Sequence, residues 1–289
     1  MELMIIQLLI TGISYGMIYS LVGIEYTLVW NSSGLLNFSH DRLITLGAYI
    51  FGGSMIIQYN LDYPLAIIIS LAIMGGVGAL IASQVFNRLY SMRSNIFAII
   101  GTVVLSKIIA ELIRLYWGSG NMRVSHWLDK TYMVGKVAIR QANVVICIVA
   151  ILLVVALELF AKYTRPGKAM RCVEQNKKAA KLMGINVDAS ICLTTAISAM
   201  ICATVGMLVI PLVNISFTMA ITIGLKGFCS GVIGGFGYIP GAILGGMFIG
   251  IVENLATLVI PTVYKDVVSF VFLILFLLIK PSGFLGKKA

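Results

Sequence analysis

The sequence predicts an all-α membrane protein, a polytopic bundle of about eight to ten transmembrane helices. Hydrophobic residues make up 60% of the 289 residues, charged residues make up only 11%, and the mean hydropathy is +1.01. A soluble domain carries about 25% charged residues. The hydrophobicity also extends along the whole chain, which favours a single transmembrane domain over residues 1–289 rather than a soluble domain with one anchor.

Apolar runs of spanning length recur from one end of the chain to the other. A spanning helix needs about 20 mostly apolar residues. We expect nine helices, at about 4–30, 43–59, 64–86, 95–116, 143–161, 189–213, 217–233, 238–261 and 266–280. The glycine-rich stretch after Ile221 could instead hold a broken or re-entrant helix, since such backbone is tolerated at membrane depth where it is buried in protein or lines a cavity.

The distribution of Lys and Arg predicts the orientation, because cytoplasmic loops carry an excess of both. Seven of these residues lie in the loop over 162–188, and the 87–94 turn and the C-terminal tail are also basic. We therefore expect these three segments in the cytoplasm and the N-terminus outside. The outer loop over 117–142 carries four basic residues, which this orientation does not explain. The net charge of +10 is attributed to topology, and no nucleic-acid partner is expected.

The sequence lacks the motifs of an enzyme. No GxxxxGK[ST] loop occurs, so the chain lacks this means of holding nucleotide phosphates. The five cysteines have no CxxC spacing and the two histidines lie in different loops, so no metal site is expected. Ser39, His40 and Asp41 are the residue types of a catalytic triad, but adjacent residues cannot converge as nucleophile, base and orienting acid.

Glycines recur at the spacing of closely packed helices. Small residues four apart let helix backbones approach in lipid, and such pairs are Gly12/Gly16, Gly241/Gly245 and Gly246/Gly250. The run from Gly234 to Gly241 is denser in glycine than packing requires. It is therefore a candidate gate or pathway element as well as a packing site.

The longest expected cytoplasmic loop, over 164–188, has the pattern of a short amphipathic helix. Pro166 suits the first helical turn, and Gly184 can end the helix in the left-handed conformation. Apolar residues recur near helical spacing among lysines and arginines, at Met170, Val173, Ala180 and Met183. Such a helix could rest on anionic lipid or dock onto a cytoplasmic partner protein, and the residues alone leave both readings open.

Several segments, in the same order from end to end, resemble the branched-chain amino-acid permease family of ABC importers, its LivH-type subunit in particular. These segments are Gly23–Val29, Gly34–His40, Val232–Ala242 and Tyr264–Phe270. The cytoplasmic loop is similar to the coupling loop of ABC importer permeases, and this match is carried by Gly167, Arg171, Ala179, Ala180 and Gly184–Asn186.

The resemblance implies a bacterial inner-membrane permease that works with other subunits. These are a second permease (LivM-like), two cytoplasmic ATPases and a periplasmic or lipid-anchored solute-binding protein. ATP and Mg would be bound by the ATPases, and this chain would bind no cofactor. Contact with the ATPases is expected at Arg171, Glu174, Ala179, Ala180 and Gly184. Combining the matched motifs with the polar residues and glycines at membrane depth, we expect the translocation pathway at Asn37, Ser39, His40, Lys107, Glu111, Lys226, Gly234, Gly235 and Glu253.

The chain departs from the family pattern at three places. His40-Asp41-Arg42 stands where the family commonly has His-Gly, and Lys226-Gly227-Phe228 replaces Lys-Ala-Phe. The fourth helix carries Lys107, Glu111 and Arg114 on one face, where the family typically shows uncharged polar residues. These charges could line a polar path or contact the partner permease. Alternatively, Arg114 snorkels to the interface and Lys107 and Glu111 neutralise each other.

The leading hypothesis for function is translocation of branched-chain or related small aliphatic amino acids by an ABC importer. The family also handles urea and short amides. From another class, an ion- or proton-coupled secondary transporter would use Glu25, Glu253 and the Lys107/Glu111 pair. Neither Glu25 nor Glu253 has an obvious partner in the sequence, and for Glu253 a helix–helix hydrogen bond is the simpler role.

Overall fold

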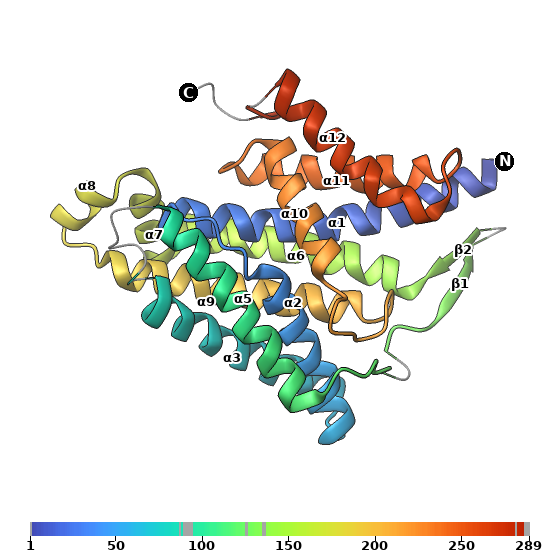
Figure 1. Cartoon of the computed structure of the whole chain (residues 1–289), viewed down its shortest axis with the longest axis horizontal. Helices are drawn as coiled ribbons and strands as arrows, with labels where there is room; N and C mark the ends of the chain where they lie inside the picture. Colours follow the sequence, from blue (N-terminus) through green and yellow to red (C-terminus); the bar gives the residue numbers. More distant parts are fainter. Residues whose placement is uncertain are drawn as a thin grey trace.

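The computed structural model describes residues 2–86, 88, 95–124, 127–134, 137–280 and 282–285 of the chain. It is an elongated bundle of long helices (Figure 1). Seven helices of the described residues are long and apolar enough to cross a membrane. The predicted fold class, a polytopic membrane helix bundle, is confirmed.

The elements along the chain are α1 (Glu2–Ser33), α2 (His40–Ala48), η1 (Tyr49–Gln58), α3 (Tyr63–Ile81), η2 (Ala82–Phe86), α5 (Asn95–Trp117), β1 (Thr131–Val134), β2 (Val137–Arg140), α6 (Gln141–Tyr163), α7 (Arg165–Gln175), α8 (Lys177–Leu182), α9 (Val187–Val209), α10 (Ile221–Gly234), α11 (Ile239–Ala256), η3 (Thr262–Tyr264) and α12 (Lys265–Ile279). Most of the 87–94 turn lies outside the described residues.

Two of the nine predicted helices differ from a simple spanning helix. The second predicted helix consists of α2 and the π-helical η1, which follow one another without a break from His40 to Gln58. The seventh is α10, which has only 14 residues. At 1.5 Å per residue it rises about 21 Å, less than the roughly 30 Å of a hydrocarbon core.

The glycine pattern of α1 and α11 is explained by direct packing of the two helices. A Cβ at Gly16 would lie 3.0 Å from the Cα of Met247, and one at Gly250 would lie 2.3 Å from the backbone nitrogen of Gly16. A Cβ at Gly12 would likewise meet the carbonyl oxygen of Gly250, at 3.0 Å. The prediction that these glycines bring helices together is confirmed, and α1 and α11 form the most extensive helix contact of the bundle.

The interior and the periphery of the bundle differ in burial. Helix α9 is largely buried and packs against α1, α2 and α3. Helices α6 and α12 have few buried residues, as expected for helices at the edge of the bundle that face lipid.

The segment over 117–142 contains a β-hairpin that the sequence analysis did not predict. Strands β1 and β2 pair in an antiparallel register with Thr131 opposite Arg140. The hairpin lies near the N-terminal end of α1, at the opposite end of the bundle from α7 and α8 (Figure 1).

Candidate functional site

The first buried polar cluster joins α1, α2 and α9 around Glu25 and His40. Nδ1 of His40 contacts Oε1 of Glu25, and both side chains are fully buried. The hydroxyl of Ser198 on α9 donates a hydrogen bond to the same carboxylate oxygen. The ring of Tyr26 packs edge-on against His40 with 4.1 Å between centroids. Glu25 therefore has a partner that sequence reasoning missed, because the two residues lie on consecutive helices that the fold brings together.

The loop before α2 places two more predicted pathway residues next to this cluster. The side-chain oxygen of Asn37 accepts hydrogen bonds from the backbone nitrogen of Ser39, at 3.0 Å, and from its hydroxyl, at 2.7 Å. Both side chains are buried. Asn37 Nδ2, Glu25 Oε2 and His40 Nε2 have no hydrogen-bond partner within the described residues. Buried polar atoms without partners are costly, so they indicate a place where water or a polar solute can bind.

The same cluster contains the residue types of a metal site. Glu25, His40 and Cys202 offer ligand atoms that all lie within 4.8 Å of one another. This group was not predicted from the sequence, because Cys202 lies on α9, far along the chain from Glu25 and His40. Nδ1 of His40 and Oε1 of Glu25 are in direct contact, and Ser198 donates to the same oxygen, so these two atoms lie too close together to be ligands spaced around an ion.

The second buried cluster surrounds Lys226 on α10. Its ammonium lies 2.7 Å from Oε1 of Glu253 on α11 and 2.6 Å from Oδ1 of Asp266 on α12. Lys265 lies 3.3 Å from the same oxygen of Glu253, and Ser269 donates to the other oxygen at 2.8 Å. Lys226 and Glu253 are fully buried, whereas the side chain of Asp266 is 40% exposed. The cluster balances two cations against two anions and reaches the surface at Asp266.

Lys226 and Glu253 were both predicted pathway residues, and the structure places them in direct contact. Lys265, Asp266 and Ser269 were not predicted as site residues. Their segment was one of those that carried the family resemblance, so that motif was the signal that could have identified them.

Gly234 and Gly235 lie in the tight turn that joins α10 to α11. A Cβ at Gly234 would lie 1.9 Å from the carbonyl oxygen of Gly241, and Gly235 has a φ of +109°. The C-terminal segment closes this turn, because the backbone nitrogens of Phe284 and Leu285 donate to the carbonyls of Ile233 and Gly234, at 2.8 and 3.1 Å. The glycines are thus required by the geometry of the turn, and a role as a gate stays a prediction.

The predicted cytoplasmic helix consists of two helices, α7 and α8, rather than one. Thr164 caps α7 by accepting from the backbone nitrogen of Gly167, and Pro166 lies in the first turn. Asn176 interrupts the helix and caps α8 by accepting from the nitrogen of Ala179 at 3.1 Å. Gly184 closes the segment with a φ of +81°, as predicted.

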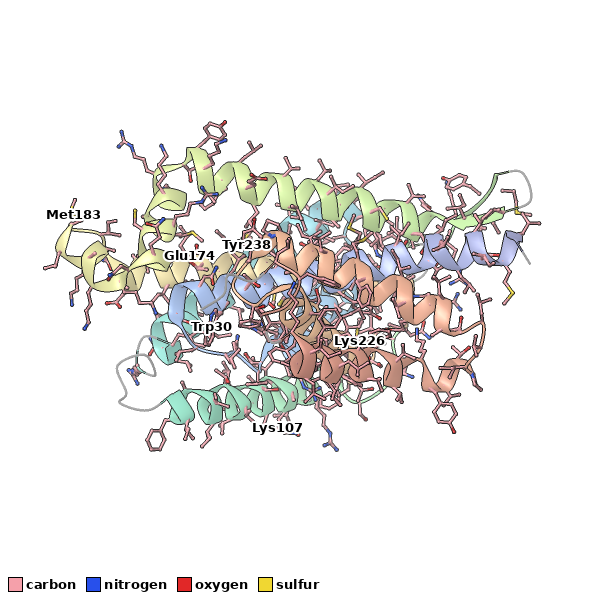
Figure 2. All side chains as sticks on the ribbon, turned by 90° about the horizontal axis from the view of Figure 1, so that it is seen from above. Trp30, Lys107, Glu174, Met183, Lys226 and Tyr238 are labelled. Atoms are coloured by element: carbon pink, nitrogen blue, oxygen red, sulfur yellow. The ribbon has the colours of Figure 1, made fainter. Side chains whose placement is uncertain are left out.

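The break at Asn176 changes which residues the loop presents outward. Ala180 is buried against the chain itself and does not lie on the exposed face of the segment, so its predicted contact with the ATPases stays a prediction. Ala179 is exposed, and the most exposed apolar side chains of the segment are Leu182 and Met183. Met183 lies at the outermost tip of the molecule (Figure 2).

A hydrogen-bonded link ties α7 to the helix ends of the bundle. Asn31, near the end of α1, donates to Oε1 of Glu174 and to the carbonyl oxygen of Gly237, the latter at 2.9 Å. Glu174 and Tyr238 lie close together where α7 meets the bundle (Figure 2). Desolvation raises the pKa of the Glu174 carboxyl above its ordinary value, while Arg171 and Asn31 act in the opposite direction.

A cavity of about 550 Å³ opens beside this link, between α1, α6, α7 and the start of α11. Its walls are mainly apolar, with Leu28, Val154 and Ile243 among them, and Arg171 and Glu174 line one side.

Lys107 and Glu111 lie apart from both buried clusters. They are exposed on α5, and Glu111 forms its ion pair with Arg114, at 4.0 Å, rather than with Lys107. Mutual neutralisation of Lys107 and Glu111, one of the two readings left open for this face, is therefore not seen. Of the nine predicted pathway residues, these two are outward-facing on the isolated chain.

Comparisons with known proteins identify the family. Residues 8–277 match the family model described as branched-chain amino acid transport system / permease component. The chain is similar to the high-affinity branched-chain amino acid transport system permease proteins LivH of Salmonella typhimurium and of Escherichia coli K12. Each is 32% identical to it over 98% of this chain and 96% of the relative. The corresponding BraD protein of Pseudomonas aeruginosa is 30% identical over the same shares. No solved structure matches. The chain is a multi-pass membrane protein that belongs to the branched-chain amino acid permease family.

Proposed function

We propose that this chain is the membrane-spanning permease subunit of an ATP-driven importer in the bacterial inner membrane, and that it translocates branched-chain or related small aliphatic amino acids. Its partners are a second permease of the LivM type, two cytoplasmic ATPases that bind ATP and Mg, and a periplasmic or lipid-anchored solute-binding protein. Family membership supports this proposal, because the relatives are named as permeases for these amino acids.

One structural observation supports the ATP-driven reading in particular. Helices α7 and α8 project beyond the bundle, and their tip exposes the apolar side chains of Leu182 and Met183. Exposed apolar side chains beside lysines suit insertion into a cleft of a cytoplasmic protein. The Glu174–Asn31–Gly237 link then transmits the movement of α7 to the end of α1 and to the turn before α11.

The test is reconstitution of the complete complex in proteoliposomes. Uptake of leucine, isoleucine and valine should require ATP and the binding protein. Met183→Glu should abolish ATPase assembly and uptake, because it places a charge in an apolar contact. Lys178→Gln, a change on the exposed side of α8, is the matched control and should leave both nearly unchanged. A large loss of uptake with Lys178→Gln and a small loss with Met183→Glu would instead indicate a helix that rests on anionic lipid.

The same vesicles test the alternatives. A secondary transporter would take up solute without ATP and would lose uptake when an ionophore collapses the ion gradient. Excess urea or acetamide should not compete with leucine. Competition by either compound would indicate that the substrate is urea or a short amide instead.

A further inference from the structure

The outward face of α5 carries charges at a depth where lipid would surround them. Lys107, Glu111 and Arg114 are all exposed, and α5 packs mainly against α2 and η1 on its other side. Lys107 lies at the outer edge of the bundle (Figure 2). Apolar residues of the same stripe, including Val104 and Ile108, are exposed beside these charges.

Lys107 is too deep to reach either membrane interface. It lies midway along the 22-residue span from Ile96 to Trp117. At a rise of 1.5 Å per residue, each end of the span is about 15 Å away. Snorkelling brings the ammonium of a lysine to the interface only from near a helix end. Arg114, close to Trp117, can snorkel, whereas Lys107 cannot.

Lys107 also lacks a counter-charge within the described part of the chain. Glu111 lies 4.0 Å from Arg114, and their charges balance. No ion pair or hydrogen bond of the Lys107 ammonium occurs with the residues that the structure describes. The stripe therefore carries one uncompensated positive charge at mid-membrane.

Two other helices of the same chain show what a lipid-facing surface looks like in this protein. The exposed faces of α6 and α12 carry no charged residue from Val144 to Leu157 or from Val267 to Ile279. The charged stripe of α5 differs from both. An ammonium facing hydrocarbon is unfavourable, and charged side chains within spans almost always face protein or a water-filled path.

We propose that the α5 stripe formed by Val104, Lys107, Ile108, Glu111, Arg114 and Leu115 is the contact surface for the second permease subunit, whose facing helix presents a carboxylate to Lys107. This inference rests on the proposed function, which supplies such a subunit. Burial of Lys107 between the two permeases against an opposite charge removes it from lipid, and the apolar neighbours pack around the pair.

The charge of the stripe argues against a second copy of this chain as the occupant. Each stripe has a net charge of +1, so two copies would leave an excess of positive charge at membrane depth. A two-fold symmetric contact would also bring the two copies of Lys107 to the same depth. A different subunit with a carboxylate at that depth balances the charge.

Photocrosslinking in the assembled complex tests the surface. Benzoylphenylalanine at Val104 or Ile108 should give an adduct with the second permease, identified by mass spectrometry. Matched controls are the exposed Leu152 on α6 and Leu277 on α12, which should give lipid adducts only. Adducts of the α5 positions with lipid alone, or with a second copy of this chain, would overturn the proposal.

Charge exchange tests the pairing. Lys107→Glu should reduce the second permease that co-purifies by at least tenfold, whereas Lys107→Arg should retain it. Changing the facing carboxylate of the partner to Lys should restore assembly with Lys107→Glu. Full assembly of the Lys107→Glu complex would reject the contact while ATP-driven uptake still supported the proposed function. Loss of ATP dependence in the unmodified complex would reject the function itself.

Discussion

Lys226 and Glu253 form a buried ion pair with 2.7 Å between Nζ and Oε1, and they do so from two different helices. Lys226 also bonds Asp266 at 2.6 Å, whereas Glu253 keeps a second cation, Lys265, at 3.3 Å. The pair is therefore asymmetric. Loss of Glu253 leaves Lys226 with one carboxylate, but loss of Lys226 takes away the shortest contact of both acids. The cluster joins α10, α11 and α12, so its charge balance bears on the stability of the C-terminal half of the bundle.

We expect Lys226→Met to be strongly destabilising, by about 3–5 kcal/mol as for other broken buried pairs. Asp266→Asn should be milder, because this side chain is 40% exposed and water screens it. The measurement is thermal unfolding of the purified protein in detergent. Equal, small effects of the two changes would show that the cluster is hydrated rather than buried.

The double variant Lys226→Met/Glu253→Gln is the control for this prediction. It removes both partners of the shortest buried contact, so it should be less destabilising than the sum of the single changes. If the losses of stability in the two single variants add up to that of the double variant, a direct interaction between Lys226 and Glu253 is contradicted.

The sequence predicted the helices well because membrane insertion imposes a simple requirement, a long apolar run, that each segment meets by itself. It did not predict which polar residues meet. Glu253 and Lys226 were both singled out, but their contact depends on the turn at Gly234 and Gly235, which reverses the chain between them. Glu25 was left without a partner because His40 reaches it only when the chain turns between α1 and α2 and α2 packs against α9.

The burial of Ala180 has a local physical cause. The periodicity of apolar residues in the cytoplasmic loop assumed one uninterrupted helix. The side chain of Asn176 instead bonds the backbone nitrogen of Ala179, which starts a new helix in a new direction. Ala180 then faces the protein, and Leu182 and Met183 face outward. The β-hairpin was missed because its four-residue strands give too short an alternation to recognise.

The link between Asn31 and Glu174 predicts different effects for two substitutions at one position. Glu174→Gln keeps an oxygen that can accept from Asn31, so uptake and solute-stimulated ATPase activity should fall only slightly. Glu174→Ala removes the acceptor and should uncouple ATP hydrolysis from uptake, as should Asn31→Ala. Uptake assays with the reconstituted complex measure this. Equal activity of the Gln and Ala variants would show that the link has no role in coupling.

The raised pKa of Glu174 predicts a pH dependence of stability. Desolvation disfavours the charged carboxylate in the folded protein, so the folded state holds its proton more tightly than the unfolded chain does. The contribution of this group to stability is therefore greatest at low pH, and it is lost as pH rises from the ordinary Glu range through the raised pKa. When unfolding is measured across that pH window, the stability of Glu174→Gln should fall less steeply with rising pH than that of the unmodified protein. An equal dependence of stability on pH in the two proteins would contradict the raised pKa of Glu174 as its cause.

Gly184 ends α8 in a conformation that side chains with a Cβ rarely adopt. Its φ is +81°, its backbone nitrogen donates to the carbonyl of Lys181 at 3.1 Å, and that of Ile185 donates to the carbonyl of Ala180 at 3.0 Å. These two hydrogen bonds form a Schellman motif. A Cβ at this position would meet no atom within 4 Å, so the effect of substitution comes from the backbone alone.

Gly184→Val should therefore destabilise the turn by at least the ~1–2 kcal/mol that a left-handed conformation costs an ordinary residue, and more because Val is β-branched. Asn tolerates this conformation, so Gly184→Asn is the matched control and should retain most activity. If the turn positions Leu182 and Met183 for the ATPases, Gly184→Val should lose ATPase assembly while the protein stays inserted and the binding protein still docks on the outer face. Co-purification of the ATPases and solute-stimulated ATP hydrolysis measure both variants. Equal loss of ATPase assembly in Gly184→Val and Gly184→Asn would indicate that the position requires glycine for close approach of a partner rather than for its φ. Full activity of Gly184→Val would show that the direction of this turn does not matter for coupling.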